Sequence, residues 1–390
     1  AKMAEYMQTF VEKYGIDIVG GCCGTTPDHI REIAKAVRTV KKTTRQPRNI
    51  NLVSGPQVAV ELDSSDSLIR IGERLNARGS LKVRRAVEEA SNIDYESLEE
   101  VVSEQVRDLG LGLIDVCMDS NIVETDKVLP DVIYRMTADF QGVMCIDSFA
   151  VEALEAAIDI YPGRAIVNSI ALEEYKPGLS KIDAILPLTK HHNPVYIALV
   201  TDGDGPALTA DKKYELAVKI VEECARYDVT PDQLMIDING FPIGSESEEG
   251  MNFTLESLNS LERIKAIHPS IMTTIGVGNL TNGLAKKPYM RKVLTSVFLD
   301  ECRKRGLDAA ILNPNHYVPV ESLDKADVEL ALQVIFDRDL DAFAALEDIA
   351  ERKKGHIVER KTSYDDLPVE QQICEKIKDG FKERELSLIH

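Results

Sequence analysis

Short apolar runs alternate with amphipathic helical patterns along most of the chain. The runs have the length of strands buried on both faces, and they occupy residues 68–73, 113–118, 143–147, 165–168, 195–200, 234–237, 272–277 and 309–313. Helical periodicity predicts helices at 96–109, 127–139, 151–161, 180–191, 210–227, 255–268, 289–305 and 328–350. Eight strands, each followed by a helix, predict an α/β fold of the (β/α)8 TIM-barrel type, with a doubly wound parallel sheet as the alternative.

The chain on either side of this repeat has a different pattern. Residues 1–40 predict a helix, a strand at 16–20, a tight loop and a helix at 29–40, which amounts to one βα unit and suggests the end of another barrel. Residues 41–66 are polar, contain Pro47 and Pro56, and predict a linker. The barrel itself is expected to span 67–355, and residues 356–390 predict a charged tail with one helix at 368–381.

Composition and charge narrow the classes of partner. The formal net charge of -19 argues against nucleic acid and anionic membranes, because both require a basic surface. No apolar run is long enough to span a bilayer, and no secretory signal is recognised at the start. Seven cysteines at scattered positions do not suggest a disulfide framework, so we expect a reducing, cytoplasmic compartment.

Polar side chains follow every predicted strand. In a barrel these positions meet at one mouth, where active sites form. Helix capping explains some of them, and Ser148 is a better candidate for that role than Asp147, which directly ends an apolar run. The positions are Glu73, Arg74, Asn76, Asp115, Asp119, Asp147, Ser148, Asn168, Ser169, Thr201, Asp202, Asp237, Asn239, Asn279 and Asn313.

A ring of Asp and Asn side chains suits a particular kind of ligand. A carboxylate accepts two hydrogen bonds from an N–H/NH2 edge, whereas a carboxamide both donates and accepts. Such a ring suits a flat heterocycle such as a pterin. It suits a sugar phosphate poorly, since no glycine-rich phosphate cradle follows the last two strands. A divalent cation held by three Asp is an alternative interpretation.

Several stretches together resemble a known family. Residues 68 to about 350 resemble the pterin-binding domain of the cobalamin-dependent methionine synthase and methyltetrahydrofolate:corrinoid methyltransferase family. The motifs that carry the resemblance are Ile71-Gly72-Glu73-Arg74-Leu75-Asn76, Ile114-Asp115-Val116, Ile146-Asp147-Ser148, Ile166-Val167-Asn168-Ser169, Met235-Ile236-Asp237, Gly278-Asn279-Leu280 and the run at 307–313. Residues 1–40 resemble the end of the family's homocysteine-binding barrel, through Gly20-Gly21-Cys22-Cys23-Gly24. Residues 356–390 resemble the start of the helical cap of a corrinoid module.

The resemblance implies a function and a set of site residues. The function is transfer of the N5 methyl group of 5-methyltetrahydrofolate to a Co(I) corrinoid, cobalamin, carried by another domain or protein. Asp147, Asn168 and Asp237 would hold the pterin edge, and Asn279 would lie near N5. Asp147, Asp237 and Asn279 would be catalytic, and the remaining pterin-binding candidates are Asn76, Asp115, Asn239 and Asn313.

The resemblance also implies a zinc site in the homocysteine-binding domain. Cys22 and Cys23 would be two of its three thiolate ligands. The third family ligand is expected upstream of this chain, so the zinc site is incomplete here.

Two barrel positions depart from the family pattern. Cys117 replaces the usual Asn, and Gly278 replaces the common Ser. A dihydropteroate-synthase-like enzyme and a folate-binding module without turnover are the alternatives. The first would need a Gly-, Ser- and Arg-rich loop after the second strand, which residues 117–120 do not provide.

Some remaining side chains have simpler interpretations. His191 and His192 end a helix and are expected to face solvent. Cys145, Cys224 and Cys302 are expected to be small apolar core residues. His316, just past the last strand, is a further candidate for ligand contact.

Overall fold

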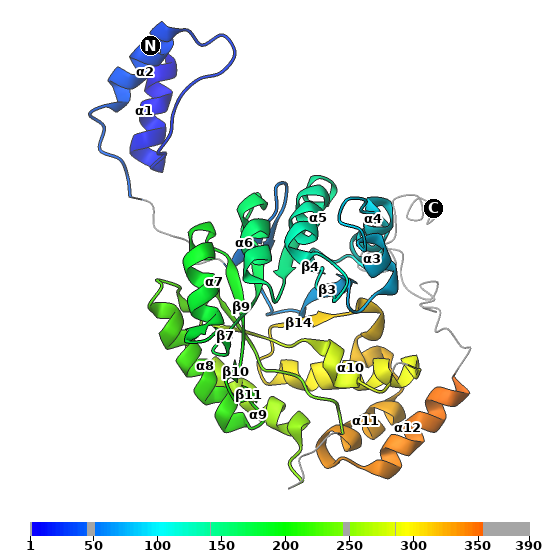
Figure 1. Cartoon of the computed structure of the whole chain (residues 1–390). Helices are drawn as coiled ribbons and strands as arrows, with labels where there is room; N and C mark the ends of the chain where they lie inside the picture. The colour runs from blue at the N-terminus through cyan, green and yellow to red at the C-terminus, as the bar shows by residue number, and fades with distance from the viewer. Residues whose placement is uncertain (1, 45–50, 141, 245–249, 285, 354–390) are drawn as a thin grey trace, which may run out of the picture. The chain divides into compact units, whose positions relative to one another are not determined.

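A computed structural model describes residues 2–44, 51–140, 142–244, 250–284 and 286–353 (Figure 1). It divides into two compact units, Ala1–Ile50 and Asn51–His390. The helix predicted at 368–381 lies outside the described residues. None of the helices in the described ranges has the length and apolar character that crossing a membrane requires.

The first unit consists of two packed helices, α1 (Lys2–Tyr14) and α2 (Pro27–Val37). Thr26 caps α2, because its hydroxyl accepts a hydrogen bond from the His29 N–H, and Pro27 occupies the first turn. The strand predicted at 16–20 is wrong, since this stretch is irregular. A strand requires a neighbour for its backbone hydrogen bonds, and the described part of this unit contains no other strand.

The second unit is an eight-stranded parallel barrel. Its strands are β3 (Ile69–Asn76), β4 (Leu113–Cys117), β5 (Val143–Asp147), β6 (Ile166–Ala171), β9 (Val195–Leu199), β12 (Leu234–Asp237), β13 (Met272–Thr274) and β14 (Ala309–Leu312). The hydrogen-bonded order is β13-β12-β9-β6-β5-β4-β3-β14. The ring closes between β13 and β14, where the Asp308 N–H bonds to the Thr273 carbonyl (3.2 Å) and the Ile311 N–H to the Ile275 carbonyl (2.9 Å). The predicted (β/α)8 fold is therefore confirmed.

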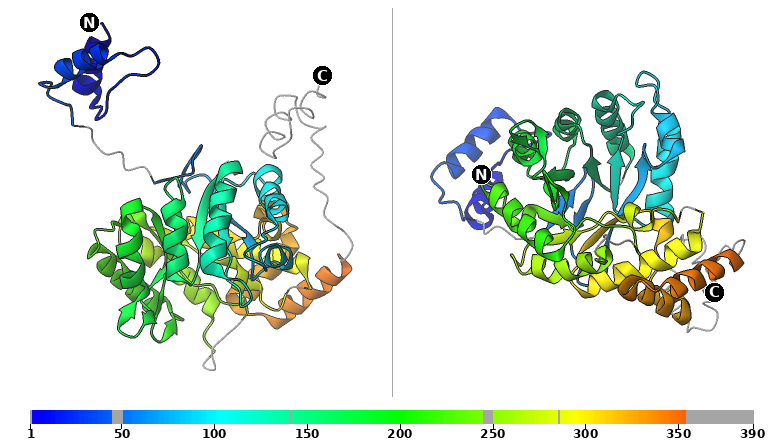
Figure 2. Two further views of the ribbon diagram at one scale, coloured as in Figure 1. Left: turned by 45° about the horizontal axis from the view of Figure 1, so that its top comes forward. Right: turned by 60° about the horizontal axis from the view of Figure 1, so that its bottom comes forward.

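Helices surround the strands on the outside of the barrel (Figures 1 and 2). They are α3 (Leu81–Ala86), α4 (Tyr95–Ser103), α5 (Thr125–Asp139), α6 (Val151–Ile160), α7 (Lys181–Thr189), α8 (Ala210–Ala225), α9 (Phe253–Lys265), α10 (Pro288–Lys304), α11 (Lys325–Asp337) and α12 (Leu340–Arg352). A π-helical turn, Glu104–Asp108, extends α4. The predicted helix at 328–350 is two helices, because Arg338 adopts a left-handed conformation and Asp339 caps α12.

A β-hairpin lies in the stretch that the sequence predicts to be a linker. β1 (Leu52–Ser54) and β2 (Ala59–Glu61) pair antiparallel, and Val53 packs against residues inside the barrel. The Ser54 N–H donates to the carbonyl of Arg164, two residues before β6 (2.9 Å). The guanidinium of Arg164 donates to the carbonyls of Leu52 (2.8 Å) and Asn193 (2.7 Å). The hairpin therefore covers the end of the barrel where the strands begin.

Candidate functional site

A cavity of about 410 Å³ opens at the carboxyl ends of the strands. We call it the acidic cavity. Its polar lining comes from six strands or the loops that follow them, and its apolar lining includes Phe149, Leu199, Pro206 and Phe241. The polar residues are Glu73, Asp115, Asp147, Asn168, Ser169, Asp237, Asn239, Asn279 and Asn282. Six of the eight predicted pterin-binding residues are thus brought together: Asp115, Asp147, Asn168, Asp237, Asn239 and Asn279.

Glu73 lines this cavity from a β-bulge in β3. The register of β3 against β4 shifts between Gly72 and Leu75. Only glycine fits at 72, because a Cβ atom there would lie 2.5 Å from Gln105 Oε1. The same oxygen accepts a hydrogen bond from the Arg74 N–H (3.1 Å), so the buried Gln105 holds the bulge.

Three carboxyl groups at the cavity have raised pKa values, mainly because they are buried. Burial and the charge of Asp147 raise the pKa of Glu73 to about 7. Burial raises the pKa of Asp147 to about 7. Burial, together with the charges of Asp147 and Glu73, raises the pKa of Asp115 well above its usual range. This carboxyl cluster (Glu73, Asp115 and Asp147) therefore retains protons near neutral pH.

Two thiols contact the carboxyl cluster from inside the barrel. Cys117 is hydrogen-bonded to Asp147, and Cys145 is hydrogen-bonded to Asp115. Burial raises the pKa of both thiols, so they remain protonated donors. Asn168 Nδ2 also donates to Asp115 Oδ1 (3.2 Å). Cys145 is buried, as expected, but it is also a polar partner of the site.

The loop after β5 is held by Asp119, not by Asp147. One oxygen of Asp119 accepts from the Ser148 hydroxyl (2.8 Å), and the other accepts from the Phe149 N–H (2.6 Å). Ser148 Oγ in turn accepts from the Ala150 N–H just before α6 (3.1 Å). The N-cap of α6 is Ala150 and no side chain in the described ranges caps this helix, so the expected capping role of Ser148 is wrong. Ser148 instead orders the loop before α6, and Asp147 stays at the cavity.

Backbone N–H groups hold Asp237, and a buried lysine holds the loop that follows it. Asp237 accepts from the backbone N–H groups of Asn239 (2.7 Å) and Gly276 (3.1 Å). Lys213 of α8 is fully buried and donates to the carbonyls of Ile238 and Asn239. Its ammonium also lies 5.0 Å from the centre of the Phe241 ring. Burial lowers the pKa of Lys213 to about 7 and raises that of Asp237 to about 6.

Sequence reasoning did not select Lys213, although a signal was present. The residue lies three and four positions before Leu216 and Ala217, on the apolar face of its helix, where a lysine is unusual. Glu73 was noted at a strand end but not chosen as a site residue. Its role depends on the bulge, which a pattern of apolar positions does not reveal.

A second cavity, of about 640 Å³, adjoins the first and shares Glu73 and Asn282 with it. We call it the basic cavity, because Arg74 and Arg291 line it together with His316. The predicted pterin-binding residues Asn76 and Asn313 line this cavity and not the acidic one. Their side-chain oxygens accept backbone N–H bonds from Gly79 (2.8 Å) and Asn315 (3.1 Å), respectively, so both also shape local turns.

Cys22 and Cys23 are exposed and line a cavity of about 600 Å³ in the first unit, with His29. His29 is already engaged, because its Nδ1 accepts from the Thr26 N–H (3.1 Å). Within the described ranges, the one group of three potential metal ligands is Asp159, His191 and His192. Two cysteines without a third ligand do not make a complete zinc site.

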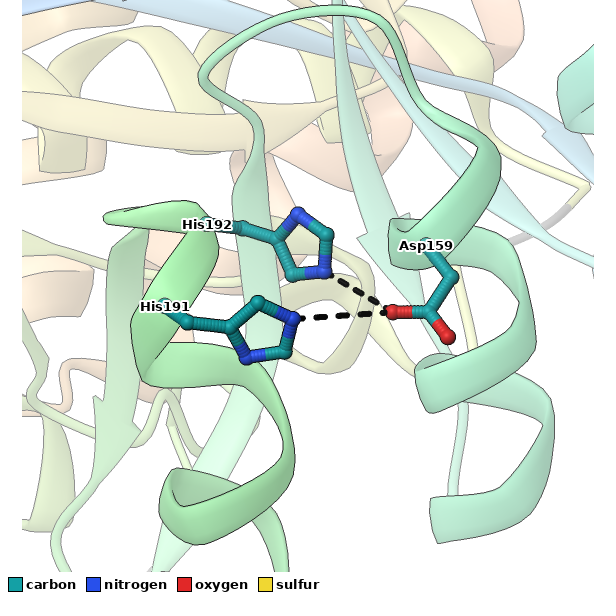
Figure 3. Close-up of side chains that lie close together, drawn as sticks. All are labelled: Asp159, His191 and His192. Carbon is teal, nitrogen blue, oxygen red and sulfur yellow. Dashed lines mark hydrogen bonds and ion pairs between the residues drawn. The ribbon is translucent and has the colours of Figure 1, made fainter.

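That group of three lies at the ends of α6 and α7 (Figure 3). His192 Nε2 is 2.8 Å from Asp159 Oδ1, and His191 Nε2 is 3.9 Å from the same oxygen. His191 is exposed, as predicted, whereas His192 is partly buried. Because α6 and α7 run back from the mouth, this group lies away from the acidic cavity.

The chain is similar both to models of known protein families and to individual relatives. Residues 72–313 match the model of the family described as pterin binding enzyme, and residues 1–37 match homocysteine S-methyltransferase. The chain is 31% identical over 389 residues to methionine synthase of Mycobacterium tuberculosis (strain ATCC 25618 / H37Rv), and 30% identical over 393 residues to methionine synthase of Mycobacterium leprae (strain TN). Each alignment covers 97% of this chain and 32% of the relative, so the chain spans about a third of those proteins.

Solved structures show weaker likeness. Xanthomonas albilineans dihydropteroate synthase with 4-aminobenzoic acid has a TM-score of 0.47 and 18% identity, and the match covers 68% of this chain and 93% of that one. Yersinia pestis dihydropteroate synthase has a TM-score of 0.45 and 13% identity, covering 78% and 99%. Likeness at this level has no bearing on function.

Proposed function

The chain belongs to the pterin-binding enzyme family, and from that premise we propose that it is a methyltransferase of the methionine synthase type. It binds 5-methyltetrahydrofolate in the acidic cavity and passes the N5 methyl group to a corrinoid carried by another domain or protein. This is the folate half-reaction of methionine synthesis. The similarity to two methionine synthases over 97% of this chain supports the proposal.

The observation that carries the proposal is the lining of the acidic cavity. Asp147 and Asn168 end or lie on the adjacent strands β5 and β6, Asp237 ends β12 on the far side of β9, and all three line one opening. A reduced pterin presents N–H and NH2 donors along one edge and a carbonyl oxygen and ring nitrogen as acceptors. Carboxylates match the donors and a carboxamide matches an acceptor. Phe149 and Phe241 supply apolar surface for the flat ring.

The reaction places one demand on the protein. When the bond between N5 and the methyl carbon breaks, its electron pair stays on N5, and N5 must gain a proton to leave as a neutral amine. Asn279 lines the cavity and would hydrogen-bond N5. The carboxyl cluster retains protons near neutral pH, so it would supply or share the proton needed. These groups act by preorganised electrostatics.

The family implies two further groups, a corrinoid and zinc, and each would belong to a domain other than the barrel. The corrinoid belongs to another domain or protein and, when reduced, supplies the nucleophile that accepts the methyl group. The acidic cavity is accessible at the barrel mouth, which is consistent with approach of such a partner. Zinc would belong to the complete homocysteine-binding domain. Cys22 and Cys23 provide only two ligands in the described residues, so we assign no step to zinc.

The proposed order of domains follows from the same similarity. Residues 1–40 are proposed to end a homocysteine-binding domain, and 41–66 to connect it to the barrel. In the latter stretch the β1–β2 hairpin already packs on the barrel, so the connection is shorter than the sequence suggests. Residues 67–355 are proposed to be the pterin-binding barrel, and 356–390 are proposed to begin a corrinoid module.

Methyl transfer to a chemically reduced corrinoid tests the proposal. Free cob(I)alamin and 5-methyltetrahydrofolate are mixed with the chain, and the loss of the Co(I) absorbance is followed. We expect saturable transfer that depends on the protein. Binding of the folate without transfer would instead identify a folate-binding module. Condensation of a pterin diphosphate with 4-aminobenzoate would identify a dihydropteroate-synthase-like enzyme.

A further inference from the structure

The basic cavity has no role in the reaction as proposed so far. It is larger than the acidic cavity, about 640 against 410 Å³, and the two share Glu73 and Asn282. Volumes of this size are typical of small-molecule sites. A ligand in the acidic cavity can therefore extend directly into the basic one.

The basic cavity is electropositive in a chain whose formal net charge is -19. Arg291, from the first turn of α10, and Arg74, from β3, both line it. His316 has its pKa lowered to about 4, first by burial and then by the charges of Arg291, Lys292 and Arg74. His316 is thus neutral at physiological pH, and its Nε2 lies 3.4 Å from Arg291 Nη1, where it can accept a hydrogen bond.

The two arginines differ in the partners that their guanidinium groups already have within the protein. Arg74 forms an ion pair with Glu104. Arg291 Nε is buried and has no hydrogen-bond partner within the described ranges. A buried guanidinium nitrogen without a partner is unfavourable, and a carboxylate is the ligand that matches a guanidinium best.

The position of Asn279 links this cavity to the proposed substrate. Gly278, Thr281 and Asn282 flank Asn279 in the chain and line the basic cavity. In the proposed function, which is the premise here, Asn279 contacts N5 of the pterin. The tail of a folate is attached at C6, the ring atom next to N5. The tail therefore leaves the pterin at the boundary between the two cavities.

We propose that the basic cavity is a subsite for the tail of the folate, with Arg291 binding a carboxylate of the glutamate. The ligand class is a pterin bearing an anionic 4-aminobenzoyl-glutamate arm. Arg74 orients the arm, and neutral His316 orients the guanidinium of Arg291. Glu73 stands between the cavities, and its raised pKa reduces repulsion toward an anion.

The test compares two ligands on matched variants by isothermal titration calorimetry. The ligands are 5-methyltetrahydrofolate and 5,6-dimethyltetrahydropterin, which lacks the arm. The variants are Arg291→Met, the conservative Arg291→Lys, and Arg226→Met, which removes an exposed arginine at the end of α8. Thermal melting first verifies that each variant is folded.

We expect Arg291→Met to weaken binding of 5-methyltetrahydrofolate by roughly tenfold to a hundredfold, the usual range for a hydrogen bond to a charged group. Binding of the tailless pterin should stay unchanged, Arg291→Lys should be intermediate, and Arg226→Met should match wild type. The loss should shrink at high salt.

Three results would overturn the inference. Arg291→Met could weaken both ligands equally or neither. Wild type could bind both ligands with the same affinity, in which case the arm makes no contact. Inorganic pyrophosphate could compete with the tailless pterin and depend on Arg291, which would identify a phosphate-bearing substrate. If neither pterin binds wild type, the proposed function itself fails.

Discussion

Replacing Glu73 by Gln should make the folded chain less sensitive to alkaline pH. The pKa of Glu73 rises from 4.5 to about 7 through burial and the nearby Asp147. Below its unfolded pKa the carboxyl is protonated in both states, and no stability is lost. Between pH 4.5 and 7 the folded state binds more protons than the unfolded state, so stability falls as pH rises.

The size of this effect follows from the change in pKa. One pKa unit corresponds to about 1.4 kcal/mol, so moving the pKa of Glu73 from 4.5 to about 7 costs the ionised folded state at most about 3.5 kcal/mol. Glu73 is partly exposed, and solvent screening reduces the figure to about 1–2 kcal/mol. Glu73→Gln removes this cost.

Urea unfolding at pH 5, 6, 7 and 8 measures the difference. We expect wild type to lose about 1–2 kcal/mol more than Glu73→Gln between pH 5 and pH 8. Glu96→Gln, on the outer helix α4, is the matched control and should follow wild type. Parallel pH curves for wild type and Glu73→Gln would refute the view that Glu73 is ionised against its surroundings.

Three further predictions concern other parts of the barrel. Lys213→Met leaves the buried Ile238 carbonyl without its donor and removes one of the two donors to the Asn239 carbonyl, so it should cost about 1–3 kcal/mol in urea unfolding at pH 7. Because the pKa of Lys213 is lowered from 10.5 to about 7, wild type should also gain stability between pH 7 and 10, and Lys213→Met should not. Gly163→Ala places a Cβ atom 2.1 Å from the Ser54 carbonyl oxygen, so it should destabilise the chain by about 1–3 kcal/mol, whereas Gly203→Ala, which has open space around it, should not. Asn279→Ala should slow methyl transfer to cob(I)alamin by about 10–100-fold with a smaller change in folate affinity, and an unchanged rate would remove Asn279 from the mechanism.

The apolar pattern predicted the alternation of strands and helices, and it left the barrel and a doubly wound sheet as the two folds that fit. Two strands, Val143–Asp147 and Leu234–Asp237, have the predicted bounds. This succeeds because a parallel strand buried on both faces is a continuous apolar run with polar residues at its end. The expectation that polar strand ends meet at one mouth follows from the same geometry, and Asp115, Asp147, Asn168, Asp237, Asn239 and Asn279 do meet there.

Features that depend on tertiary contacts were missed. Residues 52–61 form strands of only three residues each, too short for the apolar pattern to reveal, and they are ordered by packing against the barrel end and by Arg164. The break at Arg338 is a single left-handed residue in a helical pattern. The family resemblance implies that Asn76 and Asn313 contact the pterin, and the structure places both in the basic cavity beside the acidic one. Which strand ends line which cavity depends on how the side chains pack in three dimensions, and a linear pattern does not contain this information.

Titration of 5-methyltetrahydrofolate into wild type and Asp147→Asn, followed by isothermal calorimetry, tests the central claim most directly. Asp147 ends β5 inside the acidic cavity and does not hold the loop before α6. The account predicts one-to-one binding to wild type. It also predicts that Asp147→Asn weakens this binding by about tenfold to a hundredfold with no loss of thermal stability. Equal affinity for both proteins would contradict the account, and so would the absence of binding to wild type.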